Sequence, residues 1–166
     1  FGRRQFMGYH ESTQGQDVSM CDCATFTDLT SLLRPLPTTT TPADLYHGGC
    51  FPHGASLDSF RCGMWCSDTH QGAEQYARWG KQPGLQTGVI HVQITKPVVF
   101  LLLPQYPLTF LKRRYGINFP NHAIINRDLC CTLTKLGASG LADPSSQEWF
   151  LCHADQFAIL ANHTMI

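Results

Sequence analysis

Short apolar runs separated by glycine, proline and polar residues set the main limit on how this 166-residue chain can fold. The longest of them, residues 98–103, is far too short to cross a bilayer and is typical of a buried strand. Strands are also expected at 44–47, 64–67, 89–94, 148–152 and 157–161, and helices at 71–79 and 122–136. This mixture of short strands and interspersed helices predicts an α+β fold.

The chain is expected to divide near residue 43. Residues 1–43 predict an N-terminal arm, with a short helix at 27–34 and an extended connector of prolines and threonines at 35–42. Residues 44–166 predict one domain with a single core, with loops at 48–62 and 80–88 and a further helix at 107–115.

The charge balance limits the classes of partner. Lys and Arg together number 12, as do Asp and Glu, so the formal net charge is zero. A chain of this kind has no general electrostatic attraction to nucleic acid or to an anionic membrane. Neither is therefore expected as a partner.

Eight cysteines allow a disulfide framework in an oxidising compartment. A chain of this length can build a core without such cross-links, and Cys66 and Cys152 fall inside expected strands, where a free cysteine packs as a small apolar residue. Mostly reduced and buried thiols are therefore the expectation.

Several short motifs concentrate the residues that could carry chemistry. The strand at 44–47 ends in His47 and is followed at once by Gly48 and Gly49, which let backbone approach a ligand closely. Two aromatic residues, Trp65 and Tyr76, lie eleven positions apart on an expected strand and the following helix.

Taken in order, these motifs resemble the NAD-binding core of the ADP-ribosyltransferases, in the branch that includes diphtheria toxin and the poly(ADP-ribose) polymerases. The motifs are Tyr46-His47-Gly48-Gly49, Gly63-Met64-Trp65-Cys66-Ser67-Asp68, Ala73-Glu74-Gln75-Tyr76-Ala77, Gly137-Ala138-Ser139-Gly140 and Glu148-Trp149-Phe150-Leu151. The resemblance covers about residues 44–161. It implies a split β-sandwich of two small, mostly antiparallel sheets with flanking helices and NAD in the cleft between them.

The resemblance also implies roles for single residues. Glu148 would stabilise the oxocarbenium-like ribose and His47 would bind an adenosine-side ribose hydroxyl, and these two are the expected catalytic residues. Trp65 and Tyr76 would stack on the nicotinamide. The backbone of Gly48 would bind its carboxamide, and Gly49 and Ser67 would complete the NAD site, with no metal. The reaction implied is mono-ADP-ribosylation of a protein acceptor, by a secreted effector or toxin acting in a host cytosol.

Three departures from the family pattern leave other functions open. Trp65 replaces a tyrosine, Gly49 stands where serine or threonine is common, and Ala73 stands where the polymerases have a serine. A decayed module that binds NAD or ADP-ribose is therefore one alternative. An NAD-dependent RNA 2′-phosphotransferase is another, for which Arg61 is the nearby candidate for holding a phosphate.

Plainer interpretations exist for the same residues. His47, Trp65 and Tyr76 could be core residues, and Glu148 could be an exposed acid at a strand edge. Two further sites, a zinc site and a thiol-protease set, are less favoured. They would use Cys62, Cys66, His53 and His70 for zinc, and Cys50, His153 and Asp155 for the protease.

Overall fold

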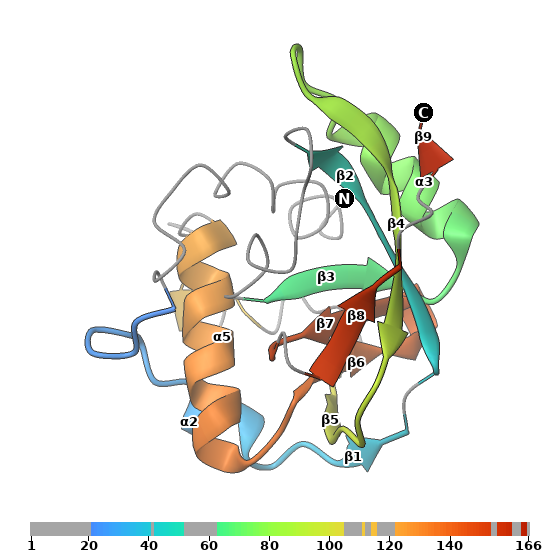
Figure 1. Ribbon diagram of the computed structural model, residues 1–166. Coiled ribbons are helices and arrows are strands. Elements are labelled where there is room, and N and C mark those ends of the chain that lie inside the picture. Colours follow the sequence, from blue (N-terminus) through green and yellow to red (C-terminus); the bar gives the residue numbers. More distant parts are fainter. Residues whose placement is uncertain are drawn as a thin grey trace.

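The protein is a mixed α+β structure in which one hydrogen-bonded sheet is flanked by helices (Figure 1). This computed structural model describes residues 21–40, 42–51, 63–104, 111, 114–115, 122–153, 156–160 and 164–165. The described strands are β1 (Thr38–Thr39), β2 (Asp44–Phe51), β3 (Met64–Ser67), β4 (Gln86–Ile94), β5 (Phe100–Leu102), β6 (Gly140–Asp143), β7 (Glu148–Leu151), β8 (Phe157–Ile159) and β9 (Thr164–Met165). The α+β class expected from the sequence is confirmed.

The strands follow the order β1-β5-β6-β7-β3-β2-β4-β8, with β9 pairing β4. All these pairs are antiparallel except β5 with β6, which is parallel. The path is continuous, so the two separate sheets expected from the family resemblance are not seen among the described residues. Within it, β2 pairs with β4 through eight residue pairs but with β3 at a single described pair, Tyr46 with Ser67.

Two of the expected helices, at 71–79 and 122–136, form close to their predicted bounds. The described α-helices are α2 (Thr30–Leu33), α3 (His70–Trp79) and α5 (His122–Leu136). Thr69 is the N-cap of α3, and its hydroxyl accepts a hydrogen bond from the backbone N–H of Gly72 at 3.1 Å. Gly137, with a φ of 72°, ends α5. The helix expected at 27–34 is shorter, and most of the one expected at 107–115 lies outside the described residues.

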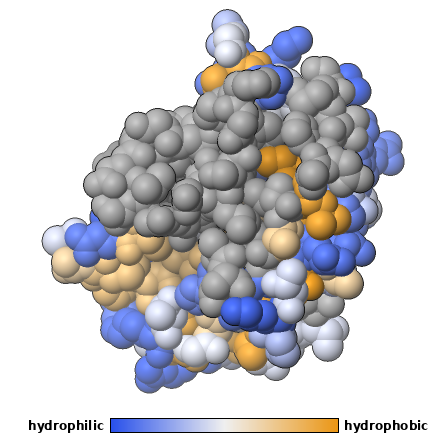
Figure 2. Space-filling view, in the orientation of Figure 1, coloured by the Kyte–Doolittle hydropathy of each residue, from blue (hydrophilic) through white to orange (hydrophobic). Residues whose placement is uncertain are grey.

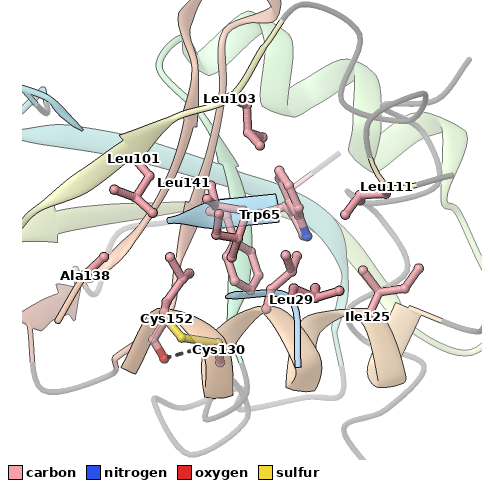
Figure 3. Close-up of a cluster of buried hydrophobic side chains, with 14 of the residues drawn as sticks. Leu29, Trp65, Leu101, Leu103, Leu111, Ile125, Cys130, Ala138, Leu141 and Cys152 are labelled. Atoms are coloured by element: carbon pink, nitrogen blue, oxygen red, sulfur yellow. Dashed lines mark hydrogen bonds between the residues drawn. A yellow bond between two sulfur atoms is a disulfide. The ribbon is translucent and has the colours of Figure 1, made fainter. Parts of the chain in front are cut away.

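Apolar side chains pack on both faces of the sheet. One cluster joins α2 and α5 to Trp65, Leu141 and Phe150 of three neighbouring strands. Figure 3 shows Trp65 surrounded by leucines, above the helix that carries Ile125. A second cluster lines the other face, from Leu45 on β2 to Phe100 on β5. The N-terminal arm contributes to the first cluster, in which its Leu29 and Leu33 are fully buried.

Several expected boundaries are wrong, and β4 already begins at Gln86, inside the loop expected at 80–88. Residues 48–51 were expected in a loop because glycine favours turns, yet they continue β2, since each pairs with a residue of β4. Gly48 is needed there for packing: an added Cβ would lie 1.7 Å from the carbonyl oxygen of Ala73 on α3. The strand expected at 98–103 is confined to Phe100–Leu102.

The expectation of mostly reduced thiols is wrong for four cysteines. Disulfides join Cys23 to Cys131 and Cys130 to Cys152. Both cross-links hold α5, one to the N-terminal arm and the other to the residue that follows β7. The sequence alone could not reveal these pairs, because the partners are separated by 108 and 22 positions.

The surface is mixed in character. Figure 2 shows polar and apolar residues interspersed over the described part of one face, so neither kind dominates it. Among the described helices, none combines the length and apolar character that a bilayer crossing requires.

Candidate functional site

Four polar side chains form a row across the middle of the sheet, which we call the polar row: Tyr46, Ser67, Glu148 and Asp143. Strand register places Tyr46 opposite Ser67, Ser67 opposite Glu148, and Glu148 opposite Asp143. Directly opposite residues on antiparallel strands project to the same face, so these four side chains are neighbours. Ser67, Glu148 and Asp143 are 1%, 1% and 2% exposed.

Glu148 is the centre of the row. The hydroxyl of Tyr76, on α3, donates a hydrogen bond to its Oε1 at 2.5 Å. The interpretation of Glu148 as an exposed edge acid is therefore wrong. Burying a carboxylate costs several kcal/mol unless polar groups compensate, so this position demands a specific environment.

Helix α3 brings Tyr76 to Glu148. Ala73, Tyr76 and Ala77 form its buried face, and Ala73 lies against Gly48 of β2. Ser67 supports the start of the same helix, because its Oγ accepts from the backbone N–H of Thr69 at 3.1 Å. Ser67 thus belongs to the polar row and also contacts the residue that caps α3.

His47 connects β2 to β3 where the two strands stop pairing. Its Nδ1 lies 2.5 Å from the carbonyl oxygen of Trp65. A carbonyl only accepts, so Nδ1 carries the hydrogen of this bond. Among the described residues, neither Gly48 nor Gly49 pairs with β3. The His47 side chain therefore joins the two strands just beyond the pair of Tyr46 and Ser67.

Trp65 is held from two sides. Its Nε1 donates to Oδ1 of Asn126 on α5 at 3.0 Å, and its ring centroid lies 4.8 Å from that of Phe150. Trp65 and Tyr76 belong to the same buried cluster, and the ring of Tyr76 meets the half-exposed Trp79 edge-on at 5.3 Å.

The expected site residues thus form two groups. Glu148, Tyr76 and Ser67 meet at the polar row. His47, one position after Tyr46 on β2, projects to the opposite face of the sheet and contacts the backbone carbonyl of Trp65. Gly48 and Gly49 are buried beside the second group.

Two residues of this region were missed. Asn126 has no distinctive sequence signal, because its role depends on the contact between α5 and β3. Asp143 had a signal: Asp143-Pro144-Ser145-Ser146 reads as a turn just before the expected strand at 148–152, and a hairpin there sets Asp143 near Glu148.

The alternative sites receive little support from the described residues. There, no three His, Cys, Asp or Glu side chains are grouped so as to hold a metal ion. Cys66 is buried in β3, and burial raises the pKa of its thiol. His53, Cys62, Asp155 and the phosphate candidate Arg61 lie outside the described residues.

A separate shallow depression of about 560 Å³ lies over α2 and contains none of the site residues. It is lined by Asp28, Thr30, Ser31, Arg34 and Pro35. Lys135 and Thr30 bind the Asp28 carboxylate and lower its pKa to about 2.

In comparisons with protein-family models, curated proteins and solved structures, none matches this chain.

Proposed function

We propose that the protein is a mono-ADP-ribosyltransferase, which cleaves the bond between nicotinamide and ribose in NAD and transfers ADP-ribose to a protein acceptor. The observation that carries the proposal is the buried Glu148 carboxylate, bound by the hydroxyl of Tyr76 from a helix 72 positions away. Cleavage of this bond develops positive charge on the ribose, and a fixed carboxylate in a site shielded from water stabilises such charge strongly.

The contact between Tyr76 and Glu148 indicates how NAD would be received. Glu148 accepts a hydrogen bond from a hydroxyl, which is the bond that a ribose hydroxyl would donate. NAD would therefore displace the Tyr76 hydroxyl, while the tyrosine ring would remain as a stacking surface for nicotinamide. Trp65, held by Asn126 and Phe150, would form a rigid wall.

The strand arrangement supports the same proposal. β2 and β3 share a single described pair, so an opening between two parts of the sheet, as the resemblance implies for NAD, would fall between these strands. His47 follows that pair on β2, and its Nδ1 donates to the backbone carbonyl of Trp65 on β3. With the hydrogen on Nδ1, Nε2 would accept a hydrogen bond from a ribose hydroxyl.

A secreted effector or toxin acting on a host protein remains the proposed setting. Disulfides form and persist in oxidising compartments, and the two described ones suit a protein that is exported.

The test is NAD turnover by the wild type and by Glu148→Gln, which keeps the size of the side chain. With labelled NAD and a host-cell lysate, we expect the wild type to label a protein band. Glu148→Gln should lower that labelling about 100-fold or more, because the charge that stabilises the transition state is removed. Nicotinamide release measures the same step without a protein acceptor.

Asp44→Asn is the matched control, since Asp44 is an exposed carboxylate paired with His91 at the start of β2. It should retain wild-type turnover. Saturable NAD binding without any turnover would instead favour the decayed binding module. Equal turnover by wild type and Glu148→Gln would exclude Glu148 as the catalytic acid.

A further inference from the structure

Asp143 is a buried acid whose two oxygens differ in their contacts within the described part of the chain. Its Oδ1 accepts from the hydroxyl of Ser145 at 2.7 Å, whereas Oδ2 is buried and has no hydrogen-bond partner among the residues that the structure describes. Asp128 is equally buried, but its two oxygens are bound by Thr27, Tyr115 and Arg127. The burial of Asp128 is thus explained, because it anchors α5 to neighbouring segments. The contacts of Asp143 do not explain its burial in the same way.

The position of Asp143 relates it to Glu148. The two face each other across the antiparallel pair of β6 and β7, so their carboxyl groups project to the same face of the sheet. Both are almost fully buried. Two neighbouring buried acids repel when ionised and weaken a fold, so packing gives no reason for the second one.

We infer that Asp143 is a second catalytic residue, which accepts the proton of a neutral acceptor group through Oδ2. The inference rests on the proposed transferase function. It assigns the acceptor to the class of groups that lose a proton when they attack, such as a hydroxyl or an N–H group, rather than a carboxylate.

The step balances as follows. The C–N bond between ribose and nicotinamide breaks, and its electron pair neutralises the pyridinium charge of the leaving nicotinamide. A lone pair of the acceptor oxygen or nitrogen forms the new bond to the ribose carbon. The acceptor proton moves to Oδ2 of Asp143, which becomes a neutral acid, while Glu148 remains ionised and stabilises the ribose.

The experiment compares two small nucleophiles in place of the protein acceptor. Methanol must lose a proton on attack, whereas azide is already an anion and needs no base. Wild-type protein and Asp143→Asn are incubated with NAD and either methanol or sodium azide, and the ADP-ribosyl products are measured by mass spectrometry. We expect Asp143→Asn to lower the methanol product about 100-fold and to leave the azide product within about 3-fold of wild type.

Ser145→Ala is the second variant, since Ser145 is exposed in the turn and its loss should not disturb folding. It removes the hydroxyl that orients Asp143, so the methanol product should fall about 3- to 10-fold, with the azide product unchanged. Asp44→Asn is the control and should match wild type with both nucleophiles. If Asp143→Asn does not fold, Ser145→Ala decides the question by itself.

Three results would count against the inference. Equal loss of both products would show that Asp143 only supports the structure, and loss of neither would show that it takes no proton. Either result, with an active wild type, overturns this inference alone. A wild type that releases no nicotinamide with any nucleophile overturns the proposed function and this inference with it.

Discussion

Some positions beside the site tolerate only one type of residue. Gly48 is the clearest case, because its missing side chain lets α3 approach β2 and so brings Tyr76 to Glu148. The sequence suggested that this glycine serves ligand contact; the described structure requires it for packing against a helix backbone, which cannot move aside.

We predict that Gly48→Ala destabilises the protein by about 3 kcal/mol or more, because an added methyl overlaps the Ala73 carbonyl. Urea denaturation measures the change in the free energy of unfolding. Gly84→Ala is the control: it meets no atom within 4 Å and carries only the strain of a positive φ, so its cost should be about 1 kcal/mol. Equal losses for the two variants would argue against the clash.

Among the secondary-structure elements, α3 is the one on which the site depends most. It starts at the Thr69 cap, which also contacts Ser67 of the polar row, and its buried face carries Tyr76. Its start, end and buried face could be predicted from the sequence, because capping and 3.6-residue periodicity are local properties.

Thr69→Ala should lower the free energy of unfolding by about 1 kcal/mol, since the N-terminal N–H groups of α3 lose their side-chain acceptor. Thermal denaturation followed by circular dichroism gives the difference. Thr95→Ala changes an exposed threonine outside any helix and should have almost no effect. If Thr69→Ala is equally silent, the cap contributes nothing measurable to α3.

At the level of the whole molecule, α5 ties the distant parts of the chain together. Its neighbouring cysteines bind Cys23 of the arm and Cys152 after β7, and its Asn126 holds Trp65. Tyr76 of α3 and Ile125 of α5 belong to one buried cluster with Trp65, which shares a face of β3 with Ser67 of the polar row, so both helices pack on the face that carries the site.

Removing the Cys23–Cys131 disulfide should destabilise the protein more than removing the Cys130–Cys152 disulfide. In the chain-entropy description a cross-link restricts the unfolded chain more when it closes a longer loop, and the separations are 108 and 22 positions. The difference expected from these loop lengths is about 1 to 1.5 kcal/mol. Urea denaturation of the two double Cys→Ser variants measures it; the reverse order would show that native contacts, not loop closure, dominate.

Local features could be predicted from the sequence: the α+β mixture, the strand Met64–Ser67, a helix over about 71–79, and the end of α5 before Gly137. These depend on residues a few positions apart. The sequence could not show that residues 48–51 extend β2 or which cysteines pair. Nor could it show that Asp143, whose Oδ2 has no hydrogen-bond partner among the described residues, faces Glu148. Those features arise because strand pairing and packing bring together residues that are separated along the chain, and only the tertiary structure sets those partners.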